Sequence, residues 1–261
     1  MNPDNRKFSD FNFADPLSAE PWVRLPDAGA IANWDEARAI AYNQQNRQHE
    51  KYRFFVKAFD YLTGNQIEGD YHEYGCHRGR TMRMALSEAR RHNRDDSKFY
   101  AFDSFAGLPE VNNQPDYELW RQGGALTTSE ADFMAMIEAH GIYADRVVPI
   151  KGFYDDSLTT NLQERLQSEG RKIALACIDC DLYESAVPVF EFMEPLLQDG
   201  CIIYIDDLFA GYHSVTTEGI AKAFLDFQAQ SDWKFLRHMD VGWWGRSYIA
   251  SRQLHPLSGN L

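Results

Sequence analysis

The segment that decides the fold lies between Ile173 and Asp207 and contains two apolar stretches, Ile173–Asp179 (IALACID) and Cys201–Asp206 (CIIYID). The first is almost continuously apolar, as in a strand of a parallel sheet that is covered on both faces. A stretch with helical spacing, Ser185–Leu197, separates the two, and each apolar stretch ends in acidic residues. This succession predicts a parallel strand–helix–strand unit.

The same alternation continues on both sides of this unit. Further strands are expected at Asp70–Gly75, Lys98–Asp103 and Val147–Lys151, with a closing β-pair at Trp233–His238 and Gly245–Ser251. Helices are expected at Asp35–Leu62, Thr81–His92, Ser129–His140, Asn161–Ser168 and Gly219–Gln228. The pattern predicts an α/β domain with a doubly wound, mostly parallel sheet. Ligands of such sheets bind beyond the carboxyl ends of the strands, where the strand order reverses.

Composition favours one large domain. Of the 261 residues, 44% are hydrophobic, which is enough for a sizeable core. Residues 1–35 lack a period and are expected to form an N-terminal arm, and residues 36–261 the domain. The formal net charge of -13 provides no basic surface for nucleic acid or an anionic membrane. The N-terminus is polar and acidic, so we expect no signal peptide, and no apolar run reaches the roughly 20 residues that a membrane helix needs.

The four cysteines lie in or beside predicted strands. Cys177 and Cys180 match a C-x-x-C pattern, but three positions apart in an extended strand their side chains point to opposite faces. No second pair completes a zinc site. We therefore expect neither a metal nor a redox role for these cysteines. Because they do not form the spaced framework of a disulfide-bonded protein, we also expect a cytoplasmic location.

Two motifs after the first strands indicate a nucleoside cofactor. Gly75 and Gly79 follow the first strand and, lacking a Cβ, would let a ligand approach the turn; an ordinary tight turn would use the same glycines. Asp103 ends the second strand, where a carboxylate commonly accepts the ribose hydroxyls. NAD and S-adenosylmethionine both satisfy this pattern, although the G-x-G-x-x-G sequence of dinucleotide dehydrogenases is absent.

Four aspartates end the two strands of the central unit: Asp179, Asp181, Asp206 and Asp207. Asp179 and Asp181 are two positions apart, so in an extended chain their side chains point the same way. Neighbouring strands lie about 4.8 Å apart, so the two acidic ends are expected to converge. Carboxylates this close repel one another unless a cation or protons intervene, and oxygen ligands favour hard ions such as Mg²⁺, Ca²⁺ or Mn²⁺. The alternative is a set of solvated acids that cap the next helices.

These residues identify a family. The chain resembles the macrocin and mycinamicin sugar O-methyltransferases, which include the novobiocin noviose methyltransferase, from about Tyr71 to Phe227. The matching segments are Glu73–Gly79, Phe102–Pro109, Lys151–Phe153 with Asp156–Leu158, Ile178–Ser185 and Gly200–Asp207. Within them, the sequence Asp-x-Asp-Leu-Tyr-Glu-Ser is specific to this group.

The resemblance implies a Rossmann-like class I methyltransferase fold, S-adenosylmethionine as methyl donor, Mg²⁺ or another hard divalent cation, and a hydroxyl of a sugar or glycosylated natural product as acceptor. Asp179, Asp206 and Asp207 would hold the metal, and Asp181 would be the general base. The residues expected to contact the cofactor are Glu73, Tyr74, Gly75, Gly79, Thr81, Asp103, Ser104, Gly152, Phe153 and Asp179. The family also implies a homodimer.

The chain departs from the family at two places. His77 stands where an aromatic or small residue is expected, and the segment from Leu208 to His213 lacks the usual Tyr-Gly start. The acceptor is therefore not carried over from the antibiotic enzymes. His213 is a second candidate base, and Trp243 and Trp244 are candidates either for stacking on a sugar ring or for the core.

Two other functions stay open. A methyltransferase of catechols or phenols would use the same divalent ion, but such enzymes usually place Asn after the second Asp, where this chain has Leu208. A scaffold protein that binds the cofactor without catalysis would have no need for the four aspartates.

Overall fold

The structure of the protein, a computed structural model, describes residues 35–110, 124, 126–209 and 217–252. The chain divides into two units, Met1–Gln48 and His49–Leu261, and the boundary falls inside helix α3 (Glu36–Gly64). The arm predicted for residues 1–35 lies outside the described residues except for Asp35. None of the described helices is both long and apolar enough to cross a membrane.

The second unit is built on a mixed sheet. Its strands are β1 (Asp70–Tyr74), β2 (Phe99–Asp103), β3 (Val147–Lys151), β4 (Ile173–Ile178), β5 (Ile202–Ile205), β6 (Lys234–Val241) and β7 (Gly245–Ser251). In the described residues the order is β3-β2-β1-β4-β5-β7-β6, with β7 antiparallel to both its neighbours and the other pairs parallel. This confirms the predicted doubly wound sheet with a closing antiparallel pair. The strand order reverses between β1 and β4, so a ligand site is expected at their carboxyl ends.

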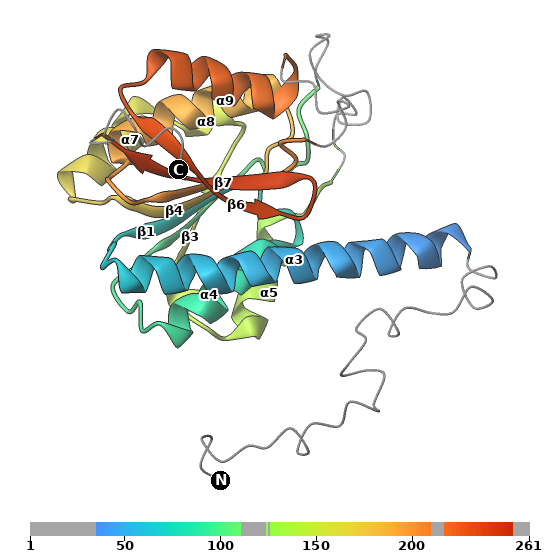
Figure 1. Cartoon of the computed structure of the whole chain (residues 1–261). Coiled ribbons are helices and arrows are strands. Elements are labelled where there is room, and N and C mark those ends of the chain that lie inside the picture. The colour runs from blue at the N-terminus through green and yellow to red at the C-terminus, as the bar shows by residue number, and fades with distance from the viewer. Residues whose placement is uncertain (1–34, 111–123, 125, 210–216, 253–261) are drawn as a thin grey trace, which may run out of the picture. The chain divides into compact units, whose positions relative to one another are not determined.

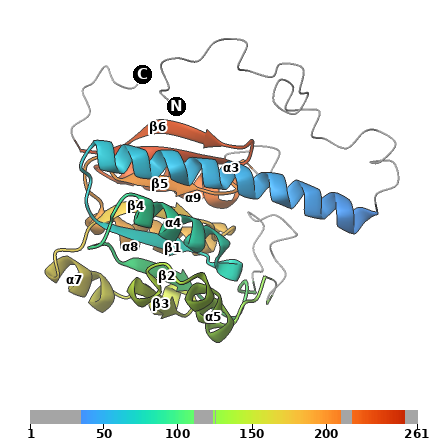
Figure 2. The same cartoon turned by 90° about the horizontal axis from the view of Figure 1, so that it is seen from below.

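Helices cover both faces of the sheet, as Figures 1 and 2 show. On one side lie α4 (Arg80–Arg91), α5 (Glu130–His140) and α3 from His49 onward, and on the other α7 (Thr160–Ser168), α8 (Tyr183–Met193) and α9 (Gly219–Gln230). These helices agree with the predicted ones to within a few residues. Sequence periodicity did not predict the short helix α6 (Tyr154–Ser157) or the 3-10 turns η4 (His77–Gly79), η5 (Ala144–Arg146) and η6 (Glu194–Leu196), because each is about one turn long.

Alternation along the strands sorts the core into two clusters. Tyr71 of β1, Cys177 of β4 and Tyr204 of β5 belong to the cluster under α3 and α4. Tyr74 and Ile178 belong to the cluster under α8 and α9. Because successive side chains of a strand point to opposite faces, a residue two positions beyond Cys177 or Tyr204 is directed toward the α3 side. Those residues are Asp179 and Asp206.

The tryptophan pair in the turn between β6 and β7 is split. Trp244 is buried at 3% exposure and belongs to the core, whereas Trp243 is 69% exposed. The four cysteines are free and buried.

Gly75 is required by the packing of β1 against the chain that follows β4. Its φ is +93°, and a Cβ there would lie 1.9 Å from the carbonyl oxygen of Asp179. The adjacent Tyr74 carbonyl accepts a hydrogen bond from the Asp179 amide at 2.8 Å, which fixes this close approach. The glycine that the sequence suggested for ligand access is therefore demanded by the protein's own backbone.

We predict that Gly75→Ala lowers the free energy of unfolding by more than about 3 kcal/mol, because a backbone clash adds to the strained φ. Gly170→Ala is the matched control: Gly170 also has a positive φ, +69°, but nothing lies within 4 Å of its added Cβ. This control is expected to cost about 1 kcal/mol. Urea unfolding measures both, and equal losses would show that only the backbone angle matters at Gly75.

Candidate active site

The carboxyl ends of four parallel strands bring the predicted residues to one edge of the sheet. Asp103 ends β2, Gly75 follows β1, Asp179 follows β4 and Asp206 follows β5. The turn after β3 joins them, because the amide of Gly152 donates to the carbonyl of Asp103 at 3.0 Å. The predicted binding edge is therefore the edge at the switch point.

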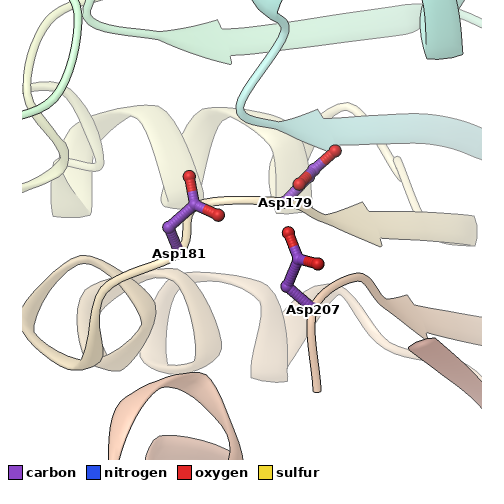
Figure 3. Close-up of side chains that lie close together, drawn as sticks. All are labelled: Asp179, Asp181 and Asp207. Atoms are coloured by element: carbon purple, nitrogen blue, oxygen red, sulfur yellow. The ribbon is translucent and has the colours of Figure 1, made fainter. Parts of the chain in front are cut away.

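Three aspartates gather there, as Figure 3 shows. Asp179, Asp181 and Asp207 each offer one carboxylate oxygen, and these oxygens all lie within 4.8 Å of one another. The chain at Asp181 is not extended as the sequence predicted, because β4 ends at Ile178 and Asp181 has a left-handed φ of 61°. Asp207 is left-handed too, with a φ of 51°. Tight turns, not strand alternation, aim these two side chains at Asp179.

The fourth aspartate, Asp206, has both oxygens engaged. The Tyr204 hydroxyl donates to its Oδ1 at 2.5 Å, and the Lys51 ammonium contacts its Oδ2 at 2.5 Å. Lys51 also donates to Oδ2 of Asp179 at 2.9 Å. Lys51 therefore joins the end of β4 to the end of β5.

Sequence reasoning missed Lys51, which lies in a polar stretch of the predicted first helix. A signal was present: Lys51 is four residues before Phe55, and Phe55, Phe59 and Leu62 are buried on the same helical stripe. A lysine in an apolar stripe needs a buried partner. Its side chain is only 8% exposed.

Burial and mutual repulsion shift the titration of this cluster. Burial, reinforced by Asp206, raises the pKa of Asp179 to about 7 although Lys51 opposes the shift. Burial and the charge of Asp207 raise the pKa of Asp181 well above its ordinary value. Burial alone would lower the pKa of Lys51, but Asp179 and Asp206 raise it well above the ordinary value. Oxygen ligands whose ionised forms are destabilised together fit a hard divalent cation.

Asp103 organises the part of the edge where the sequence predicts the cofactor. Its Oδ2 accepts from the Cys76 amide and its Oδ1 from the Phe105 amide, each at 2.7 Å. These bonds fix the carboxylate and leave each oxygen a further lone pair, as ribose hydroxyls require. Ser104 donates to the carbonyl of Gly107 at 2.7 Å and thereby shapes the next turn.

The other residues expected to contact the cofactor differ in how accessible their side chains are. Tyr74 is fully buried and stacks on Phe102 with centroids 4.6 Å apart, so only its backbone faces the edge. Thr81 is 8% exposed in the first turn of α4, and Phe153 is 42% exposed after β3. At Gly79, an added Cβ would meet the ring of Phe133 at 3.2 Å.

Two histidines singled out in the sequence lie in different parts of the chain. His213, the second candidate base, lies outside the described residues. His77, where the chain departs from the family, has its Nδ1 3.0 Å from the Thr128 hydroxyl, so it links the first turn to the segment before α5.

Glu73 is 1% exposed, and its Oε2 accepts from the Tyr71 hydroxyl at 2.5 Å. Burial is the main reason that the pKa of Glu73 rises from 4.5 to about 8. The folded protein therefore binds this proton more tightly than the unfolded chain does. Stability from the protonated carboxyl is present at low pH and is lost as the pH rises from about 4.5 through about 8.

We predict that Glu73→Gln, which keeps the acceptor for Tyr71, removes this loss. Between pH 5 and 9 in EDTA, the free energy of unfolding of the unsubstituted protein should fall by about 4 kcal/mol relative to the variant. Glu138→Gln on the exposed surface of α5 is the control and should follow the unsubstituted protein. Parallel pH curves for the unsubstituted protein and Glu73→Gln would contradict the prediction.

Comparisons of sequence agree on one family. A family model described as macrocin-O-methyltransferase (TylF) matches residues 46–243. The 8-demethyl-8-(2,3-dimethoxy-alpha-L-rhamnosyl)-tetracenomycin-C 4'-O-methyltransferase of Streptomyces olivaceus is 29% identical over 146 residues, 54% of this chain and 53% of that protein. The demethyldecarbamoylnovobiocin O-methyltransferase of Streptomyces niveus is 26% identical over 151 residues, 56% of this chain and 55% of that protein. Each match thus spans about half the length of the relative.

Comparisons of structure support the fold. The O-methyltransferase NovP superposes with a TM-score of 0.64 at 20% identity, covering 77% of this chain and 79% of that one. The calicheamicin methyltransferase CalS11 superposes with a TM-score of 0.59 at 18% identity, covering 95% and 98%. These likenesses confirm the predicted Rossmann-like methyltransferase fold.

Proposed function

The chain belongs to the macrocin O-methyltransferase family, and we propose that it transfers a methyl group from S-adenosylmethionine to a hydroxyl of a sugar or glycosylated natural product in a reaction that needs a divalent cation. The observation that carries this proposal is the convergence of Asp179, Asp181 and Asp207 at the switch-point edge of the sheet. Family membership supports the donor, and the aspartates support the cation.

A sugar acceptor is proposed from the relatives. One relative is named for a rhamnosyl derivative of tetracenomycin, and the other for demethyldecarbamoylnovobiocin. Trp243 supports a ring-shaped acceptor, because it is exposed in the turn between β6 and β7, and β7 begins beside the end of β5 with Arg246 opposite Ile205. An exposed indole at this edge offers a flat apolar surface for a sugar ring.

The residues proposed to hold the cation are Asp179, Asp206 and Asp207. Asp179 and Asp207 already place oxygens in one cluster, and Asp206 is next to Asp207 and shares Lys51 with Asp179. A bound hard cation would supply Lewis acidity, which lowers the pKa of an acceptor hydroxyl. For the donor, we propose Asp103 as the ribose ligand and the turn that contains Gly75, Gly79 and Thr81 as the rest of the binding surface.

Asp181 is proposed as the general base. When bound, S-adenosylmethionine would supply an electrophilic methyl group and leave as S-adenosylhomocysteine. A carboxylate oxygen of Asp181 would take the proton of the acceptor hydroxyl as that oxygen is methylated. Burial and the charge of Asp207 raise the pKa of Asp181, which makes its carboxylate a stronger base. Its left-handed turn fixes the carboxylate against Asp179 and Asp207.

The proposal is tested by incubating the protein with S-adenosylmethionine and a panel of rhamnosides, other glycosides and catechols, in Mg²⁺ or in EDTA. Mass spectrometry should detect a methylated glycoside together with S-adenosylhomocysteine in Mg²⁺ only. Methylation of catechols alone would move the assignment to a phenol enzyme. Absence of S-adenosylmethionine binding in calorimetry would overturn the methyltransferase proposal.

We predict that Asp181→Asn lowers kcat by about 10²–10⁴-fold at saturating Mg²⁺, while S-adenosylmethionine affinity stays within about threefold. Asp145→Asn is the control, because Asp145 is exposed in η5 before β3, at the opposite end of that strand. Calorimetric affinity and initial rates are the two measurements. A large loss of cofactor binding in Asp181→Asn would assign the residue to the cofactor site instead.

The homodimer and the cytoplasmic location stay predictions from the sequence and the family.

A further inference from the structure

Lys51 occupies carboxylate oxygens that the proposed cation also needs. Its ammonium lies 2.9 Å from Oδ2 of Asp179 and 2.5 Å from Oδ2 of Asp206. The side chains of Lys51 and Asp206 are 8% and 3% exposed, so the contact is shielded from water. Two of the three aspartates proposed as cation ligands are therefore already paired with a positive charge.

The position of Lys51 is fixed by the packing of α3. Phe54, three residues on, packs on Tyr204 with ring centroids 4.6 Å apart, and Tyr204 in turn donates to Asp206. Phe55 is fully buried and packs edge-on against Tyr71 at 6.0 Å. The helix is thus packed on β5 and β1 directly after Lys51, and the lysine stem is the flexible part that carries the ammonium.

The Lys51 ammonium and a divalent cation cannot both bind these oxygens at full strength. A carboxylate in a low-dielectric site interacts strongly with the nearest positive charge, and a second cation at the same oxygens is repelled by the first. Both oxygens of Asp206 already have a partner, Tyr204 at Oδ1 and Lys51 at Oδ2, so a metal that binds Asp206 must share an oxygen with one of them.

We propose that Lys51 is a positioning residue that competes with the divalent cation: its ammonium holds Asp179 and Asp206 together when the cation is absent and must give up contacts when the cation binds. This inference rests on the proposed cation site. The consequence is a protein that keeps its fold without metal and binds metal less tightly than its carboxylates alone would.

The test measures Mn²⁺ binding, by electron paramagnetic resonance of the free ion, to the purified full chain without S-adenosylmethionine. Lys51→Met removes the ammonium and keeps most of the apolar stem. Lys57→Met is the matched control, because it removes the same charge from an exposed position of the same helix. Lys51→Arg keeps the charge.

Lys51→Met should bind Mn²⁺ about tenfold more tightly or better, because a competing charge is lost from the ligands. Lys57→Met and Lys51→Arg should stay within about threefold of the unsubstituted protein. In EDTA, Lys51→Met should also lose about 5 °C or more in Tm, because two buried carboxylates lose their partner, and Mg²⁺ should restore more of the Tm than it does in the control.

Each outcome separates the two proposals. If the unsubstituted protein binds Mn²⁺ and Lys51→Met binds it equally or more weakly, competition is overturned and the metal site stands. If Lys51→Met binds Mn²⁺ and the unsubstituted protein does not, competition is supported and a metal requirement is contradicted. Absence of binding by both overturns both. If Lys51→Met does not fold, Lys51→Gln, whose amide still donates a hydrogen bond, is expected to tighten binding, and unchanged affinity overturns the inference.

Discussion

Several carboxylates lie close together at one buried edge of the sheet, and placing them there costs free energy that the rest of the site must offset. Each of Asp179, Asp181, Asp206 and Asp207 is favourable there only if positive charge or protons compensate for lost hydration. Lys51 supplies part of that charge from α3, and Tyr204 supplies a hydrogen bond from the strand itself. The raised pKa of Asp179, about 7, and of Asp181 shows that the compensation is incomplete. This deficit supports the proposal that a hard cation binds here.

The elements of the fold were largely predictable, because the strands are buried on both faces and the helices between them have clear periods. Ile173–Ile178 is buried at every position, as its continuous apolar sequence indicated. Periodicity also gave the closing pair β6–β7. It could not give α6 or the 3-10 turns, because these are too short to show a period. Which of the two tryptophans is buried could not be predicted, because it depends on a single turn. In this turn Gly242, with a φ of +58°, packs against the ring of Trp244, and Trp243 is exposed.

The site was predictable in its residue types but less so in its geometry. Asp179 and Asp206 lie where strand alternation places them, on the α3 side. Asp181 reaches the same cluster through a left-handed turn, which the spacing of residues does not reveal. Lys51 was missed because it is about 130 residues away in sequence and joins the site only through tertiary packing; the hydrogen bond to Asp179 spans a separation of 128 residues. Contacts this distant in sequence follow from the fold and not from a local motif.

We propose that a divalent cation and Lys51 share one set of aspartates. Anomalous diffraction from crystals of the unsubstituted protein grown with Mn²⁺ would locate the cation relative to Lys51. We expect an anomalous peak bounded by Asp179, Asp206 and Asp207, with the Lys51 ammonium withdrawn from at least one of its two carboxylates. A peak at another place, or a peak among these aspartates with both Lys51 contacts unchanged, would contradict it.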